Sequence, residues 1–216
     1  MVSRFAVTLA LLAAIGCTVA NSRETIKGSG VAKTESRKVE KFTAIELDVG
    51  RLTVEQTGTE SLTVTADDNV LPILTTKVDG DTLILSVENG KSFSGKEPVF
   101  AVTVAALRRL ELNGSGAVQA SKLDGDSLSA SIAGSGSAKL AGRASELNLS
   151  ISGSGSIDAA QLQAKRAKAE VSGSGSLTVN ASDELDAEIS GSGTIWYIGS
   201  PKLKSDVSGS GSIRRK

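Results

Sequence analysis

The sequence Leu-Asn-Leu-Ser-Ile-Ser-Gly-Ser-Gly-Ser-Ile at residues 147–157 is one copy of a pattern that fills the second half of the chain. Its Gly-Ser-Gly tripeptide recurs with first glycines at Gly114, Gly134, Gly153, Gly173, Gly191 and Gly209. The steps between these glycines are 20, 19, 20, 18 and 18 residues. Self-similarity at such a period indicates a repeat architecture. We call these six tripeptides the glycine ladder.

Apolar and polar residues alternate strictly around each tripeptide. In the copy quoted above, Leu149, Ile151 and Ile157 share one parity with both glycines, whereas serines occupy positions 150, 152, 154 and 156. Successive strand side chains point to opposite faces, so this alternation indicates half-buried strands. A period near 19 residues is too short for a strand–helix repeat, but it suits one coil of a β-solenoid whose coils stack about 4.7–4.9 Å apart. We therefore predict an all-β fold with apolar columns inside and serine columns outside.

The paired glycines are predicted to form a corner of each coil. A corner needs either an unusual φ or a close approach of two chain segments, and glycine permits both. The alternative is a phosphate-binding loop. A dinucleotide fingerprint requires a helix after the glycines, and here each tripeptide continues into another strand.

The amino-acid composition argues against several classes of function. The 216 residues hold 24 Lys and Arg against 24 Asp and Glu, so no strong field attracts nucleic acid. Aromatic residues make up 3% of the chain, which argues against a stacking platform for bases. The absence of histidine excludes Ser-His-Asp and Cys-His catalysis and removes the commonest metal ligand. We therefore expect no cofactor, no metal site and no nucleic-acid partner.

Residues 1–20 are predicted to be a signal peptide. Arg4 precedes an apolar run from Phe5 to Ile15 that is too short to span a bilayer and is typical of an export signal. The following Ala-Ile-Gly-Cys at 14–17 resembles a bacterial lipobox, which implies lipidation of Cys17, the single cysteine. The alternative is ordinary cleavage after Ala20. Residues 21–37, rich in Ser, Lys, Glu and Gly, are predicted to be a flexible linker.

Residues 38–216 are predicted to form one domain in two parts, an irregular part over 38–112 and the regular ladder over 113–216. In the irregular part, Ile45, Leu47, Leu52 and Val54 suggest a degenerate first coil in which the parity shifts at Gly50. Asp79-Gly80 separates the apolar segments 73–78 and 83–87, which is a hairpin signal.

These segments carry a family resemblance. Phe-Thr-Ala-Ile-Glu-Leu at 42–47, Leu-Thr-Val-Thr-Ala-Asp-Asp-Asn at 62–69, Asp-Gly-Asp-Thr-Leu at 79–83 and the repeated Ser-Gly-Ser-Gly together resemble the "putative auto-transporter adhesin, head GIN domain" family, DUF2807. The resemblance covers roughly residues 38–213. It implies a right-handed parallel β-helix in an exported bacterial protein, often a lipoprotein. It supplies no catalytic residues, and Asp48-Val49-Gly50 stands where the family usually has Ser-Gly-Ser-Gly.

Two charged clusters have competing interpretations. Asp67-Asp68-Asn69 could bind calcium or provide acid/base groups, but adjacent strand residues point to opposite faces, and Asx residues at a strand end favour a turn. Arg214-Arg215-Lys216 could contact anionic lipid, but charges on an end coil also guard against edge-to-edge pairing. We favour a turn for the first cluster and protection of the end coil against edge-to-edge pairing for the second.

Trp196, the single tryptophan, falls five residues after Gly191, where the other coils carry outward polar residues. The ladder therefore predicts that its ring is substantially exposed. It could pack on a neighbouring segment, or it could contact a sugar or protein ligand, because exposed tryptophan is enriched at binding hot spots.

These observations favour a non-catalytic exported envelope protein that acts as an adhesin or as a binding or structural module. We expect attachment to the membrane, through a lipid on Cys17, and contact with envelope polysaccharide or protein, in the outer membrane or periplasm. The alternative is a β-helix polysaccharide lyase or hydrolase, which would require charged residues to converge on one outer groove. Ice binding by the serine wall is a third hypothesis.

Overall fold

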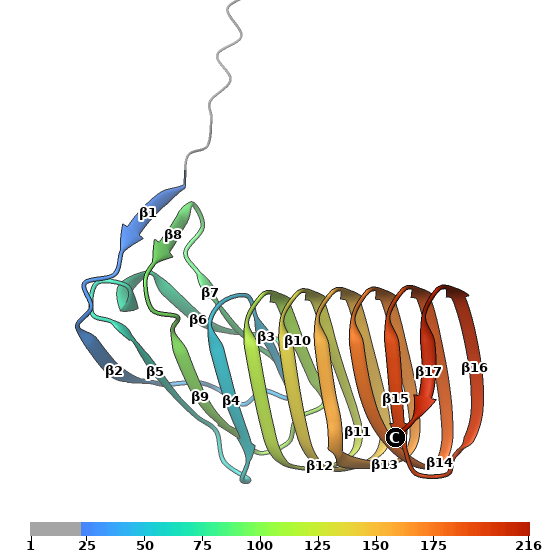
Figure 1. Ribbon diagram of the computed structural model, residues 1–216. Helices are drawn as coiled ribbons and strands as arrows, with labels where there is room; N and C mark the ends of the chain where they lie inside the picture. The colour runs from blue at the N-terminus through green and yellow to red at the C-terminus, as the bar shows by residue number, and fades with distance from the viewer. Residues whose placement is uncertain (1–22) are drawn as a thin grey trace, which may run out of the picture.

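The computed structural model describes residues 23–216, which form β-strands and one short 3-10 turn (Figure 1). The coils of the second half stack side by side along one axis, and the first half covers one end of that stack. This confirms the predicted all-β solenoid. Cys17 and the predicted signal peptide lie outside the described residues.

Eight strands build the regular stack. They are β10 (Arg109–Gly114), β11 (Ala117–Gly134), β12 (Ser137–Gly153), β13 (Ser156–Gly173), β14 (Ser176–Gly191), β15 (Thr194–Ile198), β16 (Lys202–Gly209) and β17 (Ser212–Arg215). Each long strand bends around a coil and pairs in parallel with the next coil along most of its length. Equivalent residues therefore lie above one another, as the ladder predicted.

The predicted parity of the coils is confirmed. Ile132, Ile151, Val171 and Ile189 pair in register on β11 to β14, and all four are buried. Ser152, beside Ile151, is exposed. Each coil thus buries branched apolar side chains against both neighbours, which is the main stabilising contribution in such a stack.

The two glycines of each tripeptide have different roles. The first adopts positive φ, for example 125° at Gly153, a region that other residues avoid. A Cβ on the second, Gly155, would lie 2.8 Å from the carbonyl oxygen of Gly136 on the preceding coil. The predicted corner is confirmed. The five corners from Gly134 onward also donate a hydrogen bond to the coil before them, such as Ser154 N–H to the Gly134 carbonyl at 2.9 Å, so these amides are not available to a phosphate.

Nine strands build the irregular part. They are β1 (Glu24–Lys27), β2 (Ala32–Arg37), β3 (Ala44–Leu47), β4 (Arg51–Gln56), β5 (Ser61–Asp67), β6 (Leu74–Asp79), β7 (Thr82–Val87), β8 (Lys91–Ser94) and β9 (Val99–Val104), with a 3-10 turn at Leu71–Ile73. β3 and β4 pair in parallel with β10 and β11, so they form the first coil, as predicted. β6 and β7 form the predicted antiparallel hairpin, with Gly80 at φ 61° in its turn.

The prediction that residues 21–37 form a flexible linker is wrong for residues 24–27 and 32–37, which form strands β1 and β2. β1 pairs in parallel with β8, and β2 pairs antiparallel with β5. β2 is held at its end by Arg37, whose guanidinium donates to the carbonyl oxygens of Leu71 and Leu74 at 2.8 and 2.6 Å. Polar composition indicated a linker, but backbone pairing to an exposed strand edge does not require apolar side chains.

Candidate functional site

A groove of about 600 Å³ crosses β11, β12, β13 and β14 on the outside of the stack. It lies at the bend that each coil makes between its two flat walls. A column of small residues that pair in register, Gly125, Ala144, Ala164 and Ala181, runs beneath it, and the first three of them line its floor. Because none of these carries more than a methyl group, the surface is hollowed there. We call this feature the coil groove.

Polar side chains flank this floor on both sides. One flank is the in-register column Asp124, Arg143, Gln163 and Asn180. The other flank is Asp126, Ser145, Lys165 and Ser182. At roughly 4.8 Å per coil, the four coils present donors and acceptors over about 14 Å along the stack. An extended ligand lying along the groove would meet a new pair of polar groups at every coil.

The local sequence explains why the coils bend here. Gly142 adopts φ 139°, and a Cβ on it would clash with the backbone of Leu123 on the preceding coil. Lys122 also takes positive φ, 58°, and its ammonium pairs with Glu55 at 2.8 Å. The side chain of Gln56 bonds both the N–H and the carbonyl of Asp124, at 3.2 and 2.8 Å. The first coil thus fixes the end of the groove.

The electrostatics of the coil groove are balanced. Arg143 lies 3.1 Å from the carboxylate of Asp124, and Asp126 and Lys165 bring one further charge of each sign. The Arg143 and Asp124 side chains are 74% and 61% exposed. An ion pair this exposed contributes about 0–1 kcal/mol to stability, so its polar atoms can exchange partners with a ligand at little cost.

A second ion-pair system follows the flat wall beside the coil groove. Arg166 bonds Glu146 at 2.6 Å, and this hydrogen bond, with the charge of Glu146, raises the pKa of Arg166. Lys204 bonds Asp186 at 2.8 Å, which raises the pKa of Lys204 in the same way. These pairs join successive coils across the surface and keep both cations charged.

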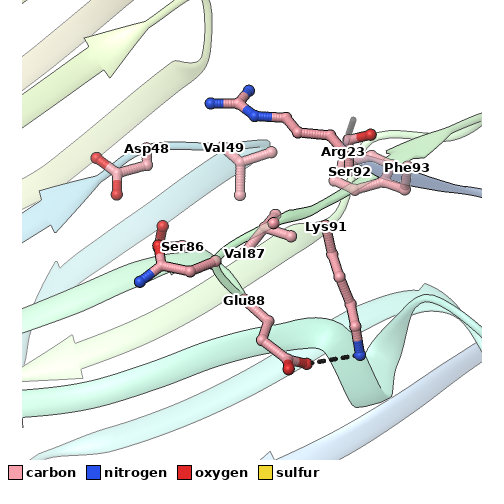
Figure 2. Close-up of a pocket in the computed structure, with 11 residues that line it drawn as sticks. Arg23, Asp48, Val49, Ser86, Val87, Glu88, Lys91, Ser92 and Phe93 are labelled. Carbon is pink, nitrogen blue, oxygen red and sulfur yellow. Dashed lines mark hydrogen bonds and ion pairs between the residues drawn. The ribbon is translucent and has the colours of Figure 1, made fainter. Parts of the chain in front are cut away.

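A separate hollow of about 480 Å³ lies at the other end of the molecule, between the β1–β8 ribbon and the first coil. Figure 2 shows that Glu88 and Lys91 point toward each other on one side of it, and their charged groups are 2.9 Å apart. The hydrogen bond that the Lys91 ammonium donates to the Glu88 carboxylate raises the pKa of Lys91. Arg23, Asp48 and Phe93 also line this hollow. Unlike the coil groove, it does not repeat from coil to coil.

The Asp67-Asp68-Asn69 cluster has the predicted turn role. Asp67 Oδ2 accepts from the N–H of Gly30 at 3.0 Å, and Asn69 Oδ1 accepts from the N–H of Ser29 at 2.9 Å. Asp68 accepts from the Ser29 hydroxyl. The cluster therefore holds the turn between β1 and β2. Within residues 23–216 no three His, Cys, Asp or Glu side chains are grouped as metal ligands.

Trp196 has the predicted outward register, because it pairs with Thr178 and Arg214 while Ile195 beside it is buried. The predicted degree of exposure is wrong, since the residue is half-buried. The guanidinium of Arg214, on the next coil, lies 5.9 Å from the ring centroid and covers one face. Trp196 also lies outside the coil groove.

Sequence reasoning did not identify the coil groove. The signal was present in the small residues at 125, 144, 164 and 181, but these lie 11, 10, 11 and 8 residues after their ladder glycines. Register shifts at the bend produce this unequal spacing. A fixed-offset alignment on the glycines therefore does not bring the four residues into one column.

The sequence model of the family described as "Putative auto-transporter adhesin, head GIN domain" matches residues 41–201. The chain belongs to this family. The match includes the first coil, the hairpin and nearly all of the stack, so the resemblance inferred from the motifs is confirmed. Membership indicates an adhesin-like protein, exported or at the cell surface. No curated protein is detectably similar to this chain.

Solved structures of other bacterial proteins share this fold. A "putative adhesin" from Bacteroides fragilis is 25% identical, with a TM-score of 0.68, covering 88% of this chain and 100% of the other. A "putative lipid binding protein" from Parabacteroides distasonis is 26% identical, with a TM-score of 0.57, covering 89% and 100%. A "putative adhesin" from Parabacteroides merdae shares the fold at 23% identity and a TM-score of 0.56, covering 89% and 99%.

The part of the chain that the structure describes includes no helix of the length and apolarity that a membrane crossing needs.

Proposed function

We propose that this head GIN protein is a non-catalytic adhesin-like binding module and that its coil groove binds a polysaccharide of the cell envelope. The observation that carries the proposal is the repetition of polar groups on both sides of a small-residue floor over four coils, in register along the flank from Asp124 to Asn180. Ligand sites are typically concave surfaces with a few well-placed polar groups. A polymer of sugar units is itself a linear repeat, so it can match such a surface along its length.

The chemistry of the flanks favours hydroxyl-rich ligands. Gln163 offers donors and an acceptor, and Ser145 offers a hydroxyl. Asn180 and Ser182 already donate to the Ala160 carbonyl and to Asp183, and their oxygens can still accept from a ligand. The formal charges of Asp124, Asp126, Arg143 and Lys165 cancel. A neutral or weakly charged glycan satisfies these groups better than an acyl chain, which could not hydrogen-bond to them.

The proposal includes the site of action. We infer that the protein is held at the envelope by a lipid on Cys17, which is consistent with an adhesin-like family and with the lipobox-like Ala-Ile-Gly-Cys at 14–17. Several acyl chains give stable anchoring, whereas a single chain binds only marginally. In this arrangement the irregular part follows the anchor directly in the chain, and the stack with its coil groove comes after it.

A lyase or hydrolase is the second candidate, because Asp124, Asp126, Arg143 and Lys165 do converge on one groove. Convergence of charged residues is what the enzyme alternative requires. The exposure of the Asp124–Arg143 pair supports binding instead, because catalytic carboxyls usually depend on burial or on close partners to shift their pKa.

Binding and turnover can be measured together. The purified protein is applied to immobilised envelope polysaccharide from its host, and soluble pectin, alginate and peptidoglycan are assayed for chain cleavage. The proposal expects saturable binding and no release of shorter chains. Turnover that disappears in Asp126→Asn or Lys165→Ala would contradict the non-catalytic assignment.

A further inference from the structure

The last coil of the stack presents an unpaired strand edge. β16 (Lys202–Gly209) pairs with β14 on one side, and no described residue pairs with its other side. It lies at the far right of the stack in Figure 1. All eight of its residues are exposed. Such an edge has free N–H and C=O groups and is a template for the addition of another strand.

Apolar side chains are uncovered along this edge. Leu203 and Val207 are 39% and 41% exposed, whereas Leu185 and Ile189, which pair with them on β14, are 1% and 3% exposed. The inward columns therefore continue to the last coil, but nothing described packs on their final members. A strand placed on β16 would cover both if it carried apolar residues opposite them.

Two columns of charged residues on the outer wall alternate in sign from coil to coil, whereas the adjoining column Glu170, Glu188, Asp206 is acidic throughout. One in-register column runs Glu146, Arg166, Glu184, Lys202, and its neighbour runs Lys168, Asp186, Lys204. Arg166 is bonded to Glu146 and is also influenced by the charge of Glu184, so an inner cation has a carboxylate on either side. Lys202 and Lys204 have a carboxylate on one side only. A further strand with acidic residues opposite Lys202 and Lys204 would continue the alternation of charge in both columns.

The charge of the last coil argues against a second copy of the chain as that occupant. Residues 202–216 hold five cations, at 202, 204, 214, 215 and 216, and one carboxylate, Asp206. Two such ends would repel each other if they met edge to edge. The same charges that prevent self-pairing would attract an acidic strand.

We propose that β16 is a docking edge for an extended segment of a partner protein. The segment adds as a further parallel strand, with acidic residues opposite Lys202 and Lys204 and apolar residues opposite Leu203 and Val207. Backbone hydrogen bonds supply the general attraction, and the alternating side chains supply the specificity. This surface is separate from the coil groove, so it does not depend on polysaccharide binding.

The probe is a labelled peptide, Glu-Leu-Asp-Ala-Lys-Ile-Ser-Gly. It copies Glu184–Gly191 of β14 with Glu188→Lys, which places a cation opposite Asp206. The control peptide, Lys-Leu-Lys-Ala-Glu-Ile-Ser-Gly, reverses the three charges. Fluorescence anisotropy with the purified whole protein should give affinity at least about tenfold higher for the first peptide. Amide hydrogen exchange should slow at residues 202–209 and nowhere else in the stack.

Variants then separate docking from nonspecific attraction. Leu203→Ser with Val207→Ser should weaken binding of the first peptide at least about fivefold, whereas Val31→Ser, at an exposed position 60% accessible to solvent, should not change it. All three substitutions are at exposed sites, and unchanged melting temperatures will verify the fold.

Four results would overturn the proposal. The first two are equal binding of the two peptides and exchange protection that misses β16. The third is concentration-dependent dimerisation of the protein alone with protection of β16, which would make a second copy the occupant. The fourth is peptide binding that is abolished by dextran sulfate but unaffected by the serine variants, which would show a surface that binds polyanions in general instead of a strand-docking edge.

Discussion

The guanidinium of Arg143 lies 3.1 Å from the carboxylate of Asp124 on the preceding coil, and this pair stands where the coil groove begins. The two residues are brought together by parallel pairing in register. The pair therefore depends on the geometry of the stack, and the first predictions concern that geometry.

Ile151→Asp should unfold the stack or lower its stability by about 3–5 kcal/mol, because it leaves a charge unpaired in the core. Ile151 is 1% exposed. Ser152→Asp, one residue further on the outer face, should change stability by less than about 0.5 kcal/mol. Chemical denaturation of both variants measures this. Similar losses from the two substitutions would mean that the parity of the coils is wrong.

Gly155→Ala should destabilise the ladder corner, because its Cβ would lie 2.8 Å from both the Gly136 carbonyl oxygen and a methyl group of Ile132. The expected loss is about 1–3 kcal/mol, as for other overpacked sites. Gly125→Ala is the matched control, since a Cβ there has nothing within 4 Å. Thermal melts compare the two. An unchanged melting temperature for Gly155→Ala would show that the corner has room to adjust.

Asp67→Ala should detach the turn between β1 and β2. The change removes the acceptor of the Gly30 N–H. Because Gly30 is exposed, water can replace that acceptor, and the expected loss is about 0.5–1.5 kcal/mol. Amide exchange should accelerate at residues 28–37 first. Asp68→Ala is the control, because its carboxylate is exposed and bonds only the Ser29 hydroxyl. Equal exchange in both variants would argue against a structural role for Asp67.

Cys17→Ser should abolish labelling by a palmitate analogue in the host and release the protein from the membrane fraction. The wild-type protein should be labelled. Cleavage after Ala20 remains the alternative, and it would remove Cys17 altogether. Absence of label in both forms, with a mature N-terminus at residue 21, would establish that alternative.

The stack could be predicted from sequence because each of its determinants is local and repeated. Ile151 and Ser152 differ in burial through strand parity alone, and Gly153 needs positive φ at a corner that recurs in every coil. The β6–β7 hairpin was likewise predictable from Asp79-Gly80. Each of these features can be found by aligning short stretches of chain.

What could not be predicted depends on pairing between distant residues. The polar residues of β2 predicted a linker, and only its antiparallel pairing with β5 makes it a strand. The half-burial of Trp196 depends on Arg214 in the next coil. The coil groove depends on the register shifts at the bend, which hide Gly125 and Ala181 from an alignment on the ladder glycines.

The central claim is that the coil groove binds an envelope polysaccharide. The most direct test compares the wild type with Gly125→Leu, which adds a side chain to the floor of the groove where there is open space, and with the flank variant Lys165→Ala. Lys96→Ala, on an exposed loop outside the groove, controls for the lost charge. Biolayer interferometry against the host polysaccharide should show binding reduced at least about tenfold by Gly125→Leu and clearly weakened by Lys165→Ala, with Lys96→Ala unchanged. Unaltered affinity in the two groove variants, with their fold intact, would contradict the claim.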